Sequence, residues 1–221
     1  MIESGVLFTH THSFRDLDLI LAPFTPAPAP VKTNYIDVPG MDGDLDLTEA
    51  HGETKFGSRN FTFKFTINPA SEMTFDEKVM QVSNALNGRE RQIILDRDNE
   101  YYWWGRLTVN EYLQDKKLGQ IVITAKVEPY KYKVEETVET FTLTPETKTI
   151  VLNNGRKSVI PLIDCTNDNT SVIFGGTGLI EEHVMNAGVH SFPDCILREG
   201  ENYVQVSGTG SITFRYREGD L

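Results

Sequence analysis

Four carboxylates near residue 45 could together ligate a cation. Asp42, Asp44, Asp46 and Glu53 have the spacing of positions 1, 3, 5 and 12 of a calcium-binding loop. Position 6 of such a loop is glycine, because glycine makes its sharp turn, but here it is Leu47, and no helical pattern flanks the segment. The sequence therefore predicts no calcium site in this stretch.

The same stretch is typical of a turn that leads into a strand. Residues 38–47 read VPGMDGDLDL, and the Pro-Gly and Asp-Gly dipeptides favour chain reversal, because proline fixes φ and glycine tolerates positive φ. Side chains alternate between the faces of a strand, so Asp44 and Asp46 share one face and Leu45 and Leu47 share the other. We expect the leucine face to be buried and the other face to be charged.

The histidines form no convincing metal-binding pattern. His10 and His12 would share one face of a strand, but no Cys, Asp or third His is spaced to complete a site with them. We interpret them as a surface pair, and we interpret His51, His183 and His190 as isolated side chains. The sequence thus predicts no metal centre.

The two cysteines, Cys165 and Cys195, are too few for a disulfide framework and lack the CxxC spacing. We interpret both as buried, reduced thiols that pack like small apolar side chains. A single disulfide between them is the alternative.

Four consecutive aromatic residues, YYWW, occupy positions 101–104. On a strand, Tyr101 and Trp103 face one side while Tyr102 and Trp104 face the other, so at least one pair belongs to the core. Tyr and Trp are also enriched in the centres of protein interfaces, and aromatic platforms bind sugars. Three roles stay open: core packing alone, core packing plus an interface, or sugar binding.

Catalytic motifs are missing from the sequence. It contains no GxSxG, HExxH, Walker or GxGxxG pattern, so it offers neither an activated nucleophile nor a phosphate-binding loop. We therefore expect the protein not to be an enzyme and to need no cofactor.

Hydrophobic periodicity indicates a mainly β chain with one helix. In FTFKFTI, residues 61–67, aromatic and polar residues alternate, as in a strand that packs an aromatic row inward. Thr74 and Glu77 have the spacing of a capping box, apolar residues then recur at helical spacing, and Asn87-Gly88 ends the run. We expect an α+β domain over residues 1–136, with a sandwich-like sheet and one helix.

The second part of the chain has a different pattern. A stretch rich in Thr and Glu lies between Glu135 and Thr149, and short β-rich runs separated by turn clusters follow it. Strands at such spacing indicate a small β-sandwich. We therefore predict a domain boundary in this stretch and a second domain over residues 137–221.

The composition excludes several classes of protein. A formal charge of -11 and a pI near 4.9 oppose binding to nucleic acid phosphates. No apolar run approaches the ~18 residues of a membrane span, and MIESGVLF at the start has an acidic residue where a secretory signal needs basic ones. We expect a protein made in the cytoplasm, without membrane insertion and without sequence-specific binding of nucleic acid.

Several of these features, in their order along the chain, resemble the distal tail proteins of long-tailed phages and related prophages. They are the run from Lys32 and Asn34 through VPGMDGDLDLTE to Arg59, the helix that ends in LNG, the aromatic hairpin, and EPYKY at residues 128–132. A closing pattern is similar too, with Gly200, Asn202, Val204, Val206, Gly208, Gly210, Ile212, Phe214, Tyr216, Arg217 and Leu221.

This resemblance implies a structural role in the virion. Members of the family form a hexameric ring at the distal end of the tail tube, with their N-terminal domains in the ring. The implied partners are the major tail tube protein, a tail-tip or tail-associated lysin protein and, in some phages, a receptor-binding protein. The C-terminal domain is expected to be galectin-like, but the galectin sugar signature, HxNxR with WxxE, is absent.

A ring implies that each copy docks on the next through unlike surfaces. The candidate interface residues are Asp44, Asp46, Arg59, Tyr102 and Trp104. Within this set we expect Asp44 and Asp46 to lie close to basic groups, with Arg59 a partner within or between subunits. The alternative function is a carbohydrate-binding or adhesion module.

Overall fold

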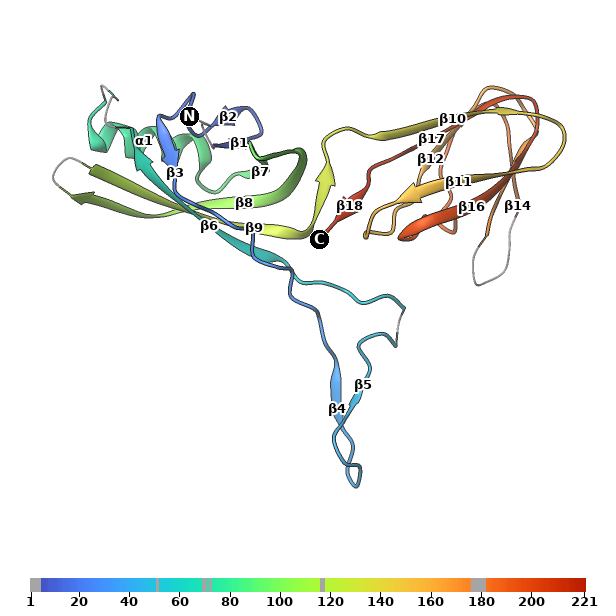
Figure 1. The fold of residues 1–221 in the computed structure, drawn as a ribbon, viewed down its shortest axis with the longest axis horizontal. Helices are drawn as coiled ribbons and strands as arrows, with labels where there is room; N and C mark the ends of the chain where they lie inside the picture. Colours follow the sequence, from blue (N-terminus) through green and yellow to red (C-terminus); the bar gives the residue numbers. More distant parts are fainter. Residues whose placement is uncertain (1–4, 51, 69–70, 72, 116–117, 176–181) are drawn as a thin grey trace. The chain divides into compact units, whose positions relative to one another are not determined.

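The computed structural model describes residues 5–50, 52–68, 71, 73–115, 118–175 and 182–221 (Figure 1). The chain divides into two compact units, one comprising residues 1–131 with Leu221 and the other running from Tyr132 to Asp220. Each unit has its own hydrophobic core. The described helix is neither long nor apolar enough to cross a membrane. Independent folding of residues 1–136 and 137–221 stays a prediction.

A sheet with strand order β2-β1-β7-β8-β9-β6-β3 forms the first unit. Its strands are β1 (Val6–Phe8), β2 (Thr11–His12), β3 (Leu19–Leu21), β6 (Arg59–Ile67), β7 (Glu90–Leu95), β8 (Asp98–Asp115) and β9 (Leu118–Lys133). The predicted aromatic row on β6 is confirmed, because Phe61, Phe63 and Phe65 are buried while the residues between them are exposed. The three rings pack in one core cluster with Phe8 and Trp103.

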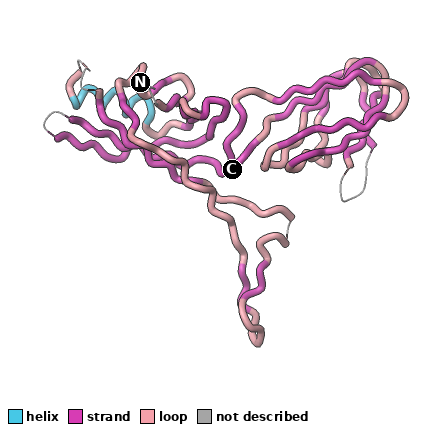
Figure 2. Tube along the Cα trace, in the orientation of Figure 1, coloured by secondary structure: helices cyan, strands magenta, loops and turns pink. Residues whose placement is uncertain are grey.

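Helix α1 (Phe75–Leu86) is the one helix of the described chain (Figure 2). It packs Val82 and Leu86 into the same core. Both hydrogen bonds of the predicted capping box between Thr74 and Glu77 are present. Gly88 follows the helix with φ of 72°, a conformation that favours glycine. The predicted helix and its two ends are therefore confirmed.

Between β3 and β6 the chain forms an arm, residues 31–56, in which β4 (Tyr35–Asp37) pairs with β5 (Asp44–Asp46). The predicted turn is confirmed, since Gly40 and Gly43 between these strands have φ of 86° and 76°. The predicted buried leucine face is wrong for the isolated chain. Leu45 is 41% exposed, Ile36 opposite it is 44% exposed, and every residue of both strands is exposed. Alternation set which side chains share a face, but no other element of the described chain buries Leu45 and Ile36 on that face.

The second unit is the predicted β-sandwich, built from two four-stranded sheets. One has the order β10 (Thr137–Leu143), β17 (Gly210–Tyr216), β12 (Leu162–Cys165), β15 (Gly188–His190). The other has the order β11 (Lys148–Asn154), β16 (Gly200–Ser207), β13 (Thr170–Phe174), β14 (Glu182–Met185). The short strand β18 (Gly219–Asp220) is outside both sheets. Cys165 and Cys195 are both buried and unbridged, as predicted.

Candidate functional site

The predicted interface residues lie in three separate regions of the first unit. Asp44 and Asp46 are on β5 of the arm, Arg59 begins β6, and Tyr102 and Trp104 are on β8. Arg59 and Trp104 line two different cavities, and the two aspartates line neither of them. The structure thus presents several candidate surfaces rather than one site.

The carboxylates of the arm are exposed to solvent. Asp46 accepts a hydrogen bond from the backbone N–H of Thr48 at 2.9 Å, and hydrogen bonding to the side chain and backbone of Thr48 lowers the pKa of Asp46 below its ordinary value. Within the described ranges, Asp42 and Asp44 have no hydrogen-bond or ion-pair partner. The arm therefore presents negative charges that are not neutralised within the described chain.

Arg59 is a buried cation with incomplete hydrogen bonding. It is the first residue of β6 and is 5% exposed, and its Nη1 donates to the carbonyl oxygen of Ala27 at 3.3 Å. Among the described residues, its Nε and Nη2 donors have no acceptor, and no carboxylate pairs with it. The expected pairing of Arg59 with Asp44 or Asp46 is therefore not made within the described subunit, and a pairing between subunits is untested.

A cavity of about 520 Å³ lies beside Arg59. Its lining includes Pro26 and Pro28 from the segment before the arm, Arg97 from the β7–β8 turn, Trp103 from β8 and Lys131 from β9. Trp103 is 3% exposed, and its indole N–H also lacks an acceptor among the described residues. Arg59 and Trp103 thus line the same cavity, while their unpaired donor atoms are buried and closed to it.

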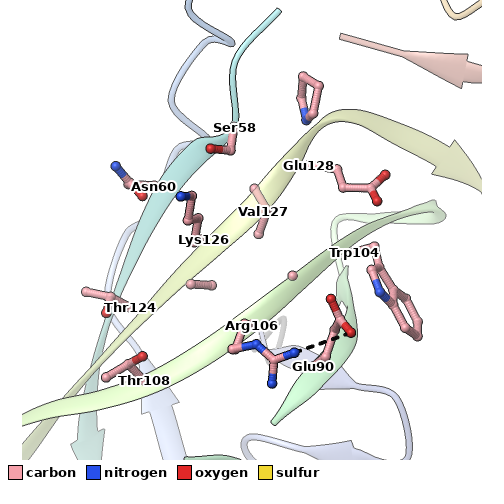
Figure 3. A pocket seen from close by; sticks show the side chains of 13 residues that line it. Ser58, Asn60, Glu90, Trp104, Arg106, Thr108, Thr124, Lys126, Val127 and Glu128 are labelled. Carbon is pink, nitrogen blue, oxygen red and sulfur yellow. Dashed lines mark ion pairs between the residues drawn. The ribbon is translucent and has the colours of Figure 1, made fainter. Parts of the chain in front are cut away.

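The open face of the sheet has a second hollow, of about 710 Å³, lined by Trp104 (Figure 3). Side chains from β6, β8 and β9 surround it, and Arg106 pairs with Glu90 at 3.6 Å on its rim. Gly105 keeps the strands close, since a Cβ there would lie 2.5 Å from Cγ1 of Val127. The aromatic tetrad is therefore split between Trp103 in the core and Trp104 at this hollow.

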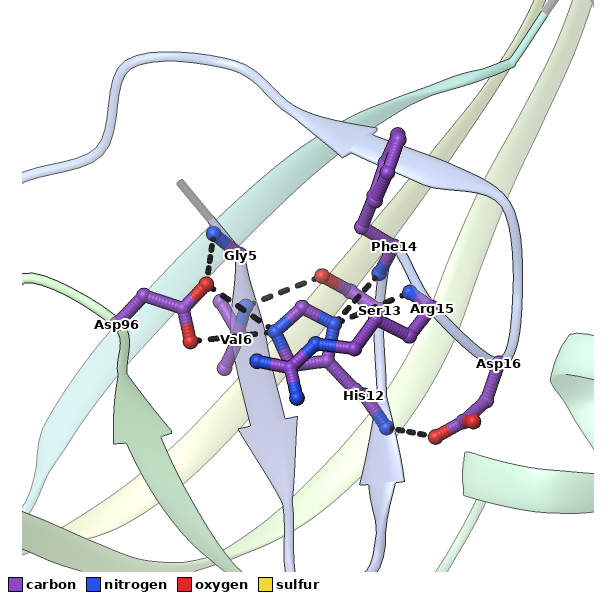
Figure 4. A network of polar contacts seen from close by, with 8 residues as sticks. All are labelled: Gly5, Val6, His12, Ser13, Phe14, Arg15, Asp16 and Asp96. Atoms are coloured by element: carbon purple, nitrogen blue, oxygen red, sulfur yellow. Dashed lines mark hydrogen bonds and ion pairs between the residues drawn. The ribbon is translucent and has the colours of Figure 1, made fainter. Parts of the chain in front are cut away.

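His12 is not a surface residue, contrary to the sequence prediction for the pair His10 and His12. It is 5% exposed, while His10 is exposed. The Nε2 atom of His12 lies 3.1 and 3.2 Å from the two carboxylate oxygens of Asp96, and Nδ1 accepts from the backbone N–H groups of Phe14 and Arg15, both at 3.1 Å (Figure 4). Because Nδ1 accepts, the proton is on Nε2, and the ring ties the first hairpin to the β7–β8 turn.

His183 is not isolated either, contrary to its interpretation from the sequence. Its Nε2 lies 2.6 Å from a carboxylate oxygen of Asp194, and the thiol of buried Cys195 is close to both, so the three could hold a metal ion. Burial raises the pKa of Cys195 to about 12, which disfavours the thiolate that metals bind. The ring of His183 also stacks on Phe192 at 4.0 Å, so we assign the cluster to packing. His51 lies outside the described residues.

Sequence reasoning missed that Arg97, Trp103 and Lys131 line one cavity with Arg59. The four residues come from different strands or turns, and no spacing rule joins them along the chain. Sheet pairing brings them together: Arg59 lies opposite Val127 on β9, and β8 lies beside β9. The available signal was a basic residue in register with the apolar, inward-facing residues of its strand.

Comparisons with known proteins agree with this architecture. A family model, the phage tail protein RIFT-related domain, matches residues 10–144, more than half of the chain. The crystal structure of SPP1 Dit (gp 19.1), described as a paradigm of hub adsorption apparatus in Gram-positive infecting phages, is similar with a TM-score of 0.72. The identity is 12%, and the match covers 97% of this chain and 98% of that one. No curated protein matches the sequence. The chain therefore belongs to the family of phage tail proteins with a RIFT-related domain, and over nearly its whole length it has the fold of a distal tail protein.

Proposed function

We propose that six copies of this structural tail component close into a ring at the distal end of the phage tail. The ring joins the tail tube to the proteins of the tip, and the first unit, which contains the family domain, builds it. Family membership and the fold support a structural rather than an enzymatic role in the virion tail. The protein is made in the host cytoplasm before the tail assembles.

The exposed arm is the observation that carries the proposal. Its strands present Tyr35, Ile36 and Leu45, each at least 41% exposed, together with the unpaired carboxylates. A two-stranded hairpin is marginally stable in water unless a further surface covers its apolar side chains. A neighbouring copy provides such a surface, and docking of one patch on a different patch closes a ring when the rotation allows it.

The proposed partners follow from the position of the ring. They are the major tail tube protein on one side, a tail-tip or tail-associated lysin protein on the other, and in addition a receptor-binding protein. The net charge of -11 per chain suits a passage for DNA, because a negative lumen does not trap phosphates.

Charge reversal on the arm tests this proposal. Asp44→Lys combined with Asp46→Lys should leave the fold intact, because both residues are exposed. The variant should sediment mostly as monomer where the unaltered chain sediments as a hexamer, because like charges at a docking face oppose association. Sedimentation velocity measures the distribution, and circular dichroism checks the fold.

Glu135→Lys combined with Glu136→Lys is the matched control. Both glutamates are exposed outside the arm, and the change in net charge is the same. Equal loss of hexamer in the two variants would show that net charge, not the arm, controls association.

Sugar binding is the second candidate, and the half-buried Trp104 at the open hollow favours it. Titration with cell-wall polysaccharide should quench tryptophan fluorescence if the hollow is a sugar platform, and Trp104→Ala should abolish the response. An unchanged signal would leave the ring as the supported function.

A further inference from the structure

Three pairs of neighbouring residues in the chain can form a cyclic imide, because in each pair an Asp or Asn precedes a glycine. They are Asp42-Gly43, Asn87-Gly88 and Asn154-Gly155. The backbone nitrogen of the glycine attacks the side-chain carbonyl carbon of the preceding residue, and glycine has no Cβ to hinder this approach. The reaction requires that this nitrogen and this side chain turn towards one another, so the local structure decides which pair reacts.

Hydrogen bonds hold both reacting groups of Asn87-Gly88 in place. Oδ1 of Asn87 accepts from the backbone N–H of Val109 at 3.0 Å. The N–H of Gly88 donates to the carbonyl oxygen of Leu107 at 2.9 Å. Ring closure would have to break both bonds, so the folded chain opposes it.

Burial and hydrogen bonding hold Asn154-Gly155 in place. Asn154 is 6% exposed, and its Nδ2 donates to the carbonyl oxygens of Lys157 at 2.9 Å and Leu197 at 3.1 Å. A Cβ built on Gly155 would lie 2.7 Å from a carboxylate oxygen of Asp220, so this glycine is packed closely. The side chain of Asn154 therefore cannot turn towards the nitrogen of Gly155 while the chain is folded.

Asp42-Gly43 is not restrained in this way. It lies in the turn between β4 and β5, where Asp42 is exposed and makes no hydrogen bond or ion pair with a described residue. Within the described ranges the N–H of Gly43 also has no acceptor, and only its chain neighbours lie within 4 Å of a Cβ built on it. The nitrogen of Gly43 and the carboxyl group of Asp42 can therefore approach one another without breaking a hydrogen bond of their own.

We propose that Asp42-Gly43 is a site of spontaneous aspartate isomerisation in the folded protein. The nitrogen of Gly43 bonds to Cγ of protonated Asp42, the Cγ–OH bond breaks, and the hydroxyl leaves as water with the amide proton. A water molecule then adds to either carbonyl carbon of the five-membered imide. Opening at Cγ restores aspartate, and opening at the backbone carbonyl carbon gives isoaspartate. One water leaves and one enters, so the mass is unchanged and no oxidant or reductant takes part.

Isomerisation would change the backbone of the arm but not its net charge. The backbone of isoaspartate runs through the side-chain methylene, so the turn gains one backbone carbon, and the carboxylate is attached directly to Cα. Asp37 pairs with Asp44 across this turn. The added carbon therefore lies in the loop whose length sets the register of β4 and β5.

Asp42→Asn makes the reaction visible by mass, because ammonia then leaves, water enters and the side-chain amide becomes a carboxylate. The variant contains three Asn-Gly pairs, so Asn87 and Asn154 are internal controls in the same molecule. The full-length variant is incubated at physiological temperature and pH, folded and in guanidinium chloride, at a dilution where sedimentation shows monomer. Peptide mapping by mass spectrometry then follows each of the three positions.

In the folded chain only position 42 should deamidate, whereas in guanidinium chloride all three positions should react. The unaltered chain, aged in the same way, should accumulate isoaspartate at position 42, identified by co-elution with a synthetic isoaspartyl peptide of residues 35–47. Asp42→Glu is the matched control, since it keeps the charge but would need a six-membered ring, and it should accumulate none.

Each other outcome contradicts the proposal. Deamidation of Asn87 or Asn154 in the folded chain as fast as at position 42 would show that the fold does not select the site. A folded position 42 that stays intact while the sample in guanidinium chloride reacts would exclude it, as would aged unaltered chain without isoaspartate. Because the assay uses monomer, its result does not depend on the proposed ring.

Discussion

A buried polar residue, His12, joins distant parts of the first unit. His12 makes hydrogen bonds with Asp96, 84 residues away, and with two backbone N–H groups of its own loop. Gly5 lies so close that a Cβ there would be 2.5 Å from the imidazole ring. The sequence could not reveal this role, because Asp96 approaches His12 only when β1 pairs with β7.

His12→Ala should lower the free energy of unfolding by about 2–3 kcal/mol, because it leaves two backbone donors without an acceptor and removes the side-chain partner of Asp96. His10→Ala is the matched control and should change it by less than about 0.5 kcal/mol, since His10 is exposed. Urea unfolding followed by circular dichroism measures both. Equal effects of the two substitutions would contradict the assigned network.

Cys195 should make stability depend on pH in alkaline solution. Burial raises the pKa of its thiol from 9.0 to about 12 in the folded chain, so the unfolded chain loses this proton first. The stabilisation is complete below pH 9 and is lost as the pH rises towards 12. Between pH 8 and pH 10.5 the midpoint temperature of thermal unfolding should fall as the pH rises. This decrease per pH unit should be smaller in Cys195→Ala. An identical slope in the two proteins would contradict this assignment.

At the scale of elements, the sequence predicted the features that depend on residues close to one another along the chain. The helix was predictable because Thr74 and Glu77 satisfy its first N–H groups, and the aromatic strand because Phe61, Phe63 and Phe65 alternate with polar residues. The exposure of Leu45 was not predictable, since alternation does not tell whether another element covers the face.

The segment between β9 and β10 should be the site where the two units separate. Val134, Glu135 and Glu136 are exposed and lie outside both strands, so a protease can reach their backbone. Limited proteolysis by an enzyme that cleaves after glutamate should release a stable fragment ending at Leu221. Mass spectrometry identifies the fragment, and digestion with no persistent product would argue against independent folding of residues 137–221.

At the scale of the whole molecule, the order of motifs predicted the family, but the geometry of the Arg59 cavity was not predictable. Turns, a capped helix and alternating strands follow one another as in distal tail proteins, and the family match and the fold confirm that resemblance. The cavity depends on residues from β6, β8, β9 and a turn, which converge only in the folded sheet.

The number of copies in the assembly tests the central claim most directly. Native mass spectrometry or light scattering should be applied to the full chain alone and mixed with the tube and tip proteins of the same phage. Six chains of 25.0 kDa give a mass of 150 kDa, which is the predicted result for the ring. A particle of 25.0 kDa at high concentration and in the presence of both partners would contradict the account.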